Sequence, residues 1–418
     1  MERIQIIIKR TLILFSMLVA CGVIGQLLLI MAYCLPTEVI ALNIGRGAES
    51  LVHQGAEYNY AEDYTESILD NETDAIMLSE ALFPSESCVE GAALVPHYVY
   101  ADKESQVFSL MAFLNHDDLS DVTILNYPRY WHGYLTILKP LFCMFDYSDF
   151  KIINQAIQLT IISTVLVLMM KKGLEKYIVA FLPMLVIWNP ATMGVSLQYA
   201  ACFYVSMIGS IIVLCRETKK DWLLFFGLGV ATSYLDFLTY PIVTFGIPMI
   251  FLIIKKAENL EKPIERILVN GVHWAIGYVG MWASKWIIGT TISHENIISD
   301  AFSNIESRTS IAVDGENITR IGAVIRLTDA AFFKWTYVLM LLGVVVYLFI
   351  KNYKKFKLNP ATIALLAISI MPIVWFMFTA NHSYIHPRLV YRNWGITVFA
   401  LLSVPVTGAR EKVQGKDE

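Results

Sequence analysis

Three acidic side chains alternate along the segment LDNETDAIML, residues 69–78. Asp70, Glu72 and Asp74 would share one face of an extended segment, and Asp70 and Asp74 would also share a face of a helix. A carboxylate there could act as general base on an acceptor hydroxyl, with Asp74 preferred and Asp70 or Glu72 as alternatives. Asp70 and Asp74 could also hold Mg²⁺ or Mn²⁺ as an optional ion. The competing interpretation is a solvated acidic loop in which a helix begins at Thr73.

The segment NHSYIHPRLVYRN, residues 381–393, concentrates basic side chains between two apolar runs. Such side chains are costly to keep at a membrane boundary without a function. Arg388 and Arg392 are one helical turn apart, so they could converge on an anionic ligand, assisted by His382 or His386. The alternative is a helix end whose basic side chains extend to the membrane surface.

The segment YPRYWHGYLTILKPLF, residues 127–142, sets Arg129 and His132 among aromatic rings ahead of a short apolar run. This run is too short to cross a bilayer, which takes about 20 apolar residues. We expect an amphipathic helix in the membrane interface, with its aromatic rings at the headgroup level. Arg129 and His132 would then stand where a lipid phosphate lies. The alternative is an interfacial anchor without a ligand.

Asp236 is a single carboxylate in the apolar segment SYLDFLTYP, residues 233–241, near the outer end of a predicted span. A carboxylate in such surroundings is rarely left without a partner. A structural pair with an arginine of another outer loop and a contact with substrate both remain open.

The composition indicates the class of fold that must position these residues. Hydrophobic residues make up 56% of the chain and charged residues only 16%, and the mean hydropathy is +0.55. These values predict an all-α polytopic membrane protein. The chain has no long basic tract, so nucleic acid is not expected as a partner.

About ten transmembrane helices are predicted. The first apolar run follows a short basic start and is too long for the apolar region of a signal peptide, so it is interpreted as an uncleaved anchor rather than a cleaved signal. The predicted spans are residues 11–33, 151–170, 177–193, 197–215, 222–238, 239–254, 267–289, 331–350, 361–380 and 393–408.

Lys and Arg in the connecting loops predict the orientation. The loops at 171–176, 216–221, 255–266 and 351–357 all carry Lys or Arg, as does the C-terminal tail, whereas the opposite loops carry few. By the positive-inside rule the N-terminus is cytoplasmic. The predicted parts are a cytoplasmic N-terminus with the first helix (1–33), an extracytoplasmic loop with interfacial helices (34–150), a multi-helix transmembrane domain (151–408) with an outer loop at about 290–330, and a cytoplasmic tail (409–418).

Cys34 and Cys88 would both face the outer compartment. A bridge between them is one option that the sequence does not establish. The absence of a larger disulfide framework, together with frequent Ile and Lys, favours a bacterial plasma membrane.

This layout resembles the GT-C class of integral membrane glycosyltransferases, which use polyprenyl-phosphate-linked sugars at the outer face of the membrane. The resemblance lies in the cytoplasmic N-terminus, the large first outer loop with its interfacial segment 127–142, and the carboxylates around Asp74. Members often carry paired acids soon after the first span, whereas ALNIGRGAES (41–50) offers only Glu49.

The resemblance implies inverting transfer of a sugar to an envelope glycan, lipid or protein acceptor. Asp74, or else Asp70 or Glu72, would take the proton of the acceptor hydroxyl. The lipid phosphate would leave, stabilised by Arg388, Arg392 and Arg129, with help from His382, His386 or His132. The alternatives are a polysaccharide polymerase, a transporter or flippase of lipid-linked glycans, and a non-catalytic envelope assembly protein.

Overall fold

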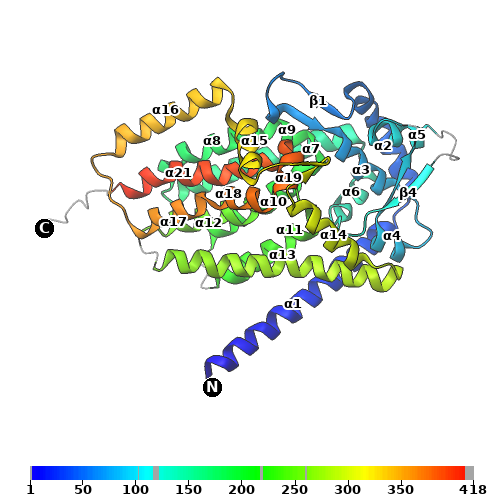
Figure 1. Cartoon of the computed structure of the whole chain (residues 1–418), viewed down its shortest axis with the longest axis horizontal. Helices are drawn as coiled ribbons and strands as arrows, with labels where there is room; N and C mark the ends of the chain where they lie inside the picture. The colour runs from blue at the N-terminus through cyan, green and yellow to red at the C-terminus, as the bar shows by residue number, and fades with distance from the viewer. Residues whose placement is uncertain (1, 102, 116–121, 217–219, 259–260, 410–418) are drawn as a thin grey trace.

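The computed structural model describes residues 2–101, 103–115, 122–216, 220–258 and 261–409, and this part of the chain is mostly helical (Figure 1). Within it, six helices are long and apolar enough to cross a membrane. A mostly helical protein with several candidate membrane spans is therefore confirmed. These helices cover Lys9–Tyr33, Tyr147–Lys171, Leu197–Cys215, Trp335–Asn352, Pro360–Phe378 and Pro387–Gly408.

The other four predicted spans correspond to helices that differ in length. They are α8 (Ile178–Trp188), α11 (Asp221–Leu235), α12 (Val243–Lys255) and α13 (Pro263–Ser293). α11 and α12 are apolar but shorter than a full span. α8 ends early because Asn189 has a positive φ of 51° and Pro190, which follows, lacks the N–H that a continuing helix would use. A total of about ten spans therefore stays a prediction.

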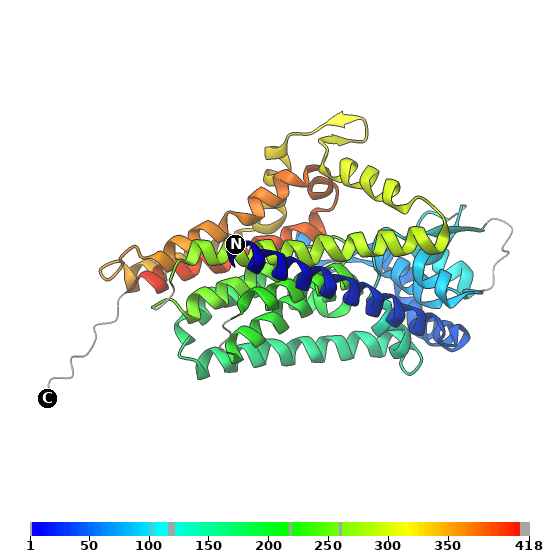
Figure 2. The ribbon, with the colours of Figure 1, turned by 90° about the horizontal axis from the view of Figure 1, so that it is seen from below.

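The segment between α1 (Glu2–Tyr33) and α7 (Tyr147–Lys171) gathers at one end of the molecule (Figures 1 and 2). Two small antiparallel sheets in it depart from the all-α prediction, because short runs of β-branched and aromatic residues pair there. Its elements are α2 (Thr37–Gln54), β1 (Glu57–Asn59), η1 (Thr65–Ser67), β2 (Ile68–Asp70), α3 (Asn71–Leu82), α4 (Cys88–Leu94), β3 (Pro96–Tyr100), α5 (Gln106–Leu114), β4 (Val122–Asn126) and α6 (Leu135–Phe142).

The predicted interfacial helix at 127–142 is helical only in its second half, α6. The aromatic residues before it are inside the protein rather than at a headgroup level, which corrects that prediction. Trp131 is fully buried and its Nε1 donates a hydrogen bond of 2.6 Å to the carbonyl of Met281. Tyr134 is also buried. Burial of an indole with its N–H bonded is more favourable than exposure at the interface.

Two further sets of elements lie between α7 and the last part of the chain. α9 (Pro190–Val195) and α10 (Leu197–Cys215) follow α8, and η3 (Glu175–Tyr177) precedes it. The predicted outer loop at 290–330 contains α14 (Ile297–Thr309), β5 (Ala312–Val313), β6 (Glu316–Asn317) and α15 (Arg320–Phe332), and α16 (Trp335–Asn352) comes after it.

The last part of the chain is a helical hairpin interrupted by prolines. It comprises α17 (Pro360–Ser369), α18 (Met371–Phe378), α19 (Ala380–Ile385), α20 (Pro387–Val390), η4 (Tyr391–Asn393) and α21 (Trp394–Gly408). The helix is interrupted before Pro387, since α19 ends at Ile385 and α20 begins at Pro387.

Close contact between α11 and α13 depends on glycine. A Cβ at Gly229 would meet the carbonyl oxygen of Trp274, and a Cβ at Gly277 would meet the carbonyl oxygen of Phe226. The two helix backbones therefore approach more closely than larger residues allow. This contact fixes one face of α13.

Candidate functional site

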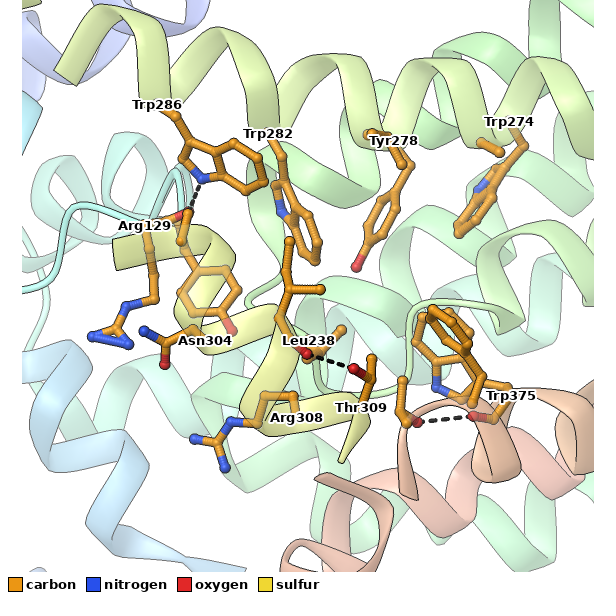
Figure 3. Close-up of a pocket in the computed structure, with 17 residues that line it drawn as sticks. Arg129, Leu238, Trp274, Tyr278, Trp282, Trp286, Asn304, Arg308, Thr309 and Trp375 are labelled. Carbon is orange, nitrogen blue, oxygen red and sulfur yellow. Dashed lines mark hydrogen bonds between the residues drawn. The ribbon is translucent and has the colours of Figure 1, made fainter. Parts of the chain in front are cut away.

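Four aromatic side chains follow one another along α13 at every fourth position. Trp274, Tyr278, Trp282 and Trp286 therefore lie on the same face of the helix (Figure 3). The rings of Trp274 and Tyr278 are stacked with centroids 4.8 Å apart, and Trp282 is 4.8 Å from Tyr278. The row forms a continuous apolar wall.

This wall borders a cavity of about 240 Å³ between α13, α14 and α18. Val279 and Phe378 also line it, and they are 55% and 58% exposed, so the cavity opens at the apolar outer surface of the helices. A long apolar ligand could enter there from lipid. The lining residues are Arg129, Tyr130, Leu238, Trp274, Ala275, Tyr278, Val279, Trp282, Trp286, Ala301, Asn304, Ile305, Arg308, Thr309, Trp375, Phe378 and Thr379.

Two arginines line the same cavity. The Nε of Arg129 is 3.2 Å from Oδ2 of Asp300, and its carbonyl accepts a 2.8 Å hydrogen bond from Nε1 of Trp286. Figure 3 shows Arg129 near Trp286, at the opposite end of the aromatic row from Trp274. Arg308 comes from α14 and has no ion-pair partner among the described residues. An apolar cavity with guanidinium groups suits a lipid that carries an anionic group.

His382 and His386 lie beside this cavity, with ring centroids 4.9 Å apart. Nε2 of His382 donates to the carbonyl of Leu238 at 2.7 Å, while its Nδ1 is buried without a partner among the described residues. Burial, followed by the charge of Arg308, lowers the pKa of His386 to about 4. Burial also lowers the pKa of His382 well below its ordinary value. Both imidazoles are therefore neutral at pH 7.

Asp236 holds the turn that carries Leu238. Its carboxylate accepts hydrogen bonds from the backbone N–H of Leu238 at 2.9 Å and of Thr239 at 3.1 Å, and from the Thr239 hydroxyl. Leu238 has a positive φ of 79°, which is unusual for a residue with a side chain. Asp236 is thus neither paired with an arginine nor free for substrate. Its role as a binding residue is corrected to that of positioning the Leu238 backbone.

A second cluster joins the outer segment to the last hairpin. Nε of Arg388 donates to Oδ2 of Asp70 at 3.0 Å, and its Nη1 donates to Glu57. Asp70 also caps α3, since it accepts from the backbone N–H and hydroxyl of Thr73 at 3.1 and 2.9 Å. Burial raises the pKa of Asp70, and hydrogen bonds from Gln198 and Thr73 oppose this. Acids and bases from distant parts of the sequence therefore meet here.

Arg392 lies deeper in this cluster and is completely buried. Its guanidinium carbon is 3.7 Å from the ring centre of Tyr199, a cation–π contact, and its Nη1 donates to the carbonyl of Arg388. Nε and Nη2 have no hydrogen-bond partner among the described residues. Arg388 and Arg392 therefore do not converge on one exposed anion. Neither of them lines the aromatic cavity.

Glu66 belongs to the same cluster and was not predicted. It is 1% exposed, and neither carboxylate oxygen has a hydrogen-bond partner among the described residues. Burial raises the pKa of Glu66 to about 7, opposed by the nearby charges of Arg392 and Lys334. A carboxylate with this pKa is suited to accept a proton near neutral pH.

The carboxylates of Asp74 and Glu72 accept hydrogen bonds from the N-terminal ends of other helices. The carboxylate of Asp74 accepts from the backbone N–H groups of Leu197 at 3.0 Å and Gln198 at 3.3 Å, and from the Tyr147 hydroxyl at 3.0 Å. Asp74 therefore stabilises the N-terminus of α10, while burial raises its pKa to about 7. Both oxygens of Glu72 accept from the backbone N–H of Gln106, the first residue of α5. This geometry favours structural roles over the predicted base function.

His132 is turned away from lipid, which corrects its predicted position. It is buried, its Nε2 is 2.9 Å from the Tyr127 carbonyl, and its Nδ1 lies 2.7 Å from the Tyr134 hydroxyl and 3.2 Å from Glu80. The Tyr134 hydroxyl itself donates to Glu80. Both ring nitrogens thus have polar partners inside the protein.

The optional metal pair does not form a recognisable site. In the parts of the chain that the structure describes, no group of three or more His, Cys, Asp or Glu side chains is arranged to hold a metal ion. The oxygens of Asp70 and Asp74 already accept hydrogen bonds from Thr73, Arg388, Tyr147 and the α10 backbone. A bound cation would have to displace these donors.

The segment 379–393 borders both clusters. Thr379 lines the aromatic cavity, His382 and His386 interact with Arg308, and Arg388 and Arg392 belong to the carboxylate cluster. The candidate residues therefore belong to two sites, which involve different parts of this segment.

In comparisons with protein-family models, with curated proteins and with solved structures, no match to this chain is found. The function must therefore be inferred from the site itself.

Proposed function

We propose that this chain is a membrane glycosyltransferase that transfers a sugar from a polyprenyl-phosphate-linked donor to a glycan, lipid or protein acceptor at the outer face of the plasma membrane. The observation that carries the proposal is the aromatic cavity along α13, which opens at the apolar surface and is lined by Arg129 and Arg308. An isoprenoid chain fits such an apolar wall, and a phosphate fits the guanidinium groups.

The donor phosphate binds Arg308, with Arg129 as its neighbour. Arg308 is free of carboxylate partners among the described residues, so it is available to an anion, whereas Arg129 already contacts Asp300. The neutral His382 and His386 lie on the Arg308 side and can donate or accept hydrogen bonds without adding charge. These assignments replace Arg388 and Arg392 as the phosphate-binding residues.

Glu66 is the general base in this proposal. Asp70 is paired with Arg388 and Asp74 is saturated by three donors, so both are weaker candidates than Glu66 with its two unpartnered oxygens. Glu66 takes the proton of the acceptor hydroxyl, whose oxygen attacks the anomeric carbon of the donor sugar. The bond from that carbon to the phosphate oxygen breaks, and the phosphate leaves with the electron pair. The sugar then lies across segment 379–393, between Arg308 and Glu66.

The proposal includes a topology. The N-terminus is cytoplasmic, about ten helices span the plasma membrane of a bacterium, and residues 34–150 and 290–330 face outward. Lys and Arg in the loops between the helices support this orientation.

Mass spectrometry of envelope glycans from cells with and without the gene tests the activity. We expect the loss of one sugar unit from a glycan when the gene is deleted, and its return with the wild-type chain but not with Glu66→Gln. Glu62→Gln is the matched control, because Glu62 is an exposed acid of the same segment. If lipid-linked glycans accumulate with the sugar already attached, a polymerase or flippase replaces the transferase proposal.

A further inference from the structure

Two cysteines meet where the outer end of α1 reaches the first outer segment. Cys34 directly follows α1 and is exposed, and Cys88 is the first residue of α4 and is half-buried. The two side chains lie close together, and the neighbouring Cys88 thiol raises the pKa of Cys34. Cys143 lies elsewhere, directly after α6.

The backbone of α4 also lies close to the side chain of Tyr33, the last residue of α1. A Cβ on Gly91 would come within 2.7 Å of the Tyr33 ring and of the Ser85 hydroxyl. Gly91 is three residues after Cys88 and thus on the same face of α4, while Tyr33 precedes Cys34 directly. Cys34 and Cys88 therefore lie where α4 packs tightly against the end of α1.

We propose that Cys34 and Cys88 form a disulfide bond in the mature protein. This inference rests on the outer orientation of residues 34–150 given with the proposed function. Thiols in an extracytoplasmic compartment meet oxidising conditions, and a pair already close together needs little backbone movement to be joined.

The oxidant is the disulfide of a thiol–disulfide exchange protein of that compartment. One thiolate of the pair attacks the oxidant's disulfide and forms a mixed disulfide. The second thiolate attacks the bound cysteine sulfur, the Cys34–Cys88 bond forms, and the oxidant leaves as a dithiol. Two electrons pass to the oxidant, which also takes up the two protons released by the thiols.

The bridge would close the chain from residue 34 to residue 88. This loop contains Glu57 and Asp70, which contact Arg388, and Glu66, which lies near Arg392. Closing it reduces the conformational freedom of the unfolded chain. The disulfide would thus tie the segment that carries the acids to the anchor helix.

Thiol trapping on whole cells tests this inference with the full-length chain. Cells are quenched in acid, free thiols are blocked with N-ethylmaleimide, and the protein is then reduced and treated with a polyethylene glycol maleimide. We expect a reductant-dependent mobility shift for the wild-type chain and for Cys143→Ser. Cys34→Ser and Cys88→Ser should each lose the whole shift, because the remaining partner is blocked in the first step. Blocking of Cys34 and Cys88 in the wild-type chain before reduction would overturn the inference.

A second measurement separates the bridge from the orientation. Intact cells with Cys88→Ser are treated with a membrane-impermeant maleimide, and labelling of Cys34 is mapped by mass spectrometry. Labelling together with a missing wild-type bridge refutes the disulfide alone. Absence of labelling refutes the outward orientation, and with it the oxidising compartment on which the proposed disulfide depends. Oxidation of the purified chain by oxidised glutathione should also give the Cys34–Cys88 peptide pair, and the formation of glutathione adducts alone would contradict it.

Discussion

At the scale of single residues, Glu66 has the environment that differs most from that of an ordinary surface glutamate. It is buried without hydrogen-bond donors to its carboxylate among the described residues, and burial raises its pKa to about 7. A base acts in its deprotonated form, so turnover should rise as the pH increases through about 7. Glu66→Gln should lower turnover about a hundredfold or more and abolish this rise. A pH profile of sugar transfer by the purified chain checks both, and an unchanged profile in Glu66→Gln would exclude Glu66 as the base.

The same raised pKa has a consequence for stability. Between its ordinary value and about 7, the folded chain keeps the proton on Glu66 while the unfolded chain releases it. The contribution of Glu66 to the free energy of unfolding therefore falls as the pH rises through this window. Glu66→Gln should flatten the decrease of the melting temperature over that range, whereas the exposed control Glu62→Gln should not change it.

Arg308 is the residue that should separate a phosphorylated lipid from a neutral one. Losing a hydrogen bond to a charged group costs about 1.5–3 kcal/mol. Arg308→Ala should therefore weaken the binding of a polyprenyl phosphate roughly 10- to 100-fold and leave that of a polyprenol unchanged. Tryptophan fluorescence reports the binding, because Trp274, Trp282, Trp286 and Trp375 line the cavity. Arg326→Ala is the control, since Arg326 is exposed and lies over the Tyr384 ring instead. Equal losses for both lipids would contradict a phosphate contact.

Asp74 should matter for folding rather than for proton transfer. Asp74→Asn keeps the size of the side chain but removes the charge that faces the N-terminus of α10. We expect the free energy of unfolding to fall by about 1–3 kcal/mol, while turnover per folded molecule is retained. Asp146→Asn is the matched control, because Asn caps the N-terminus of α7 as well as Asp does. A fully folded Asp74→Asn chain without activity would restore Asp74 as the base.

The sequence predicts some of these residues and not others. Asp70 and Arg388 are each candidates on sequence grounds, whereas their direct pairing is found only in the structure. The role of Asp74 could not be predicted, because its partners Leu197 and Tyr147 come from distant segments and are set by tertiary packing. Asp236 and His132 instead bond to close neighbours along the chain, in backbone turns that the apolar pattern does not reveal. Nothing in the sequence around Glu66 indicates that its side chain is buried. The aromatic row from Trp274 to Trp286 does carry one, the spacing of four residues, and could have been recognised.

At the scale of elements, the position of α13 decides whether the cavity exists. Gly229 and Gly277 let α11 and α13 approach each other, and any side chain there would meet a backbone carbonyl. Gly277→Ala should move α13 or strain it, with a cost of about 1–3 kcal/mol. Gly227→Ala is the control, because a Cβ on Gly227 of α11 would meet open space. Melting temperatures and lipid binding measure the effect, and equal values for the two variants would contradict close packing as its cause.

The helices themselves follow from the sequence more directly than their ends do. Long apolar runs predict α1, α7, α10 and α16 within a few residues. The predicted span 361–380 matches the candidate span Pro360–Phe378, although its helix is interrupted at Ile370, before Pro372, whereas 177–193 is broken at Asn189. These breaks occur where proline removes a backbone N–H or a residue adopts positive φ, and such local changes are not visible in an apolar pattern.

At the scale of the whole molecule, Thr379 at the start of segment 379–393 lines the apolar cavity, while Arg388 and Arg392 near its end belong to the buried acid–base cluster. The cavity is lined by aromatic rings and by Arg308, which has no ion-pair partner among the described residues. The cluster contains the Glu66 carboxylate, which accepts no hydrogen bond from these residues. A lipid-linked sugar is the class of ligand that needs both. The central claim is therefore that the cavity along α13 holds the isoprenoid chain of a polyprenyl-phosphate donor.

Photo-crosslinking tests this claim most directly. The purified chain in lipid nanodiscs is irradiated with a polyprenyl phosphate that carries a diazirine in its isoprenoid chain, and the adducts are mapped by mass spectrometry. Adducts on the face of α13 from Trp274 to Trp286 and on α14, suppressed by excess unlabelled polyprenyl phosphate, are the predicted result. Adducts spread over lipid-facing helices such as α16, and unaffected by the competitor, would contradict it.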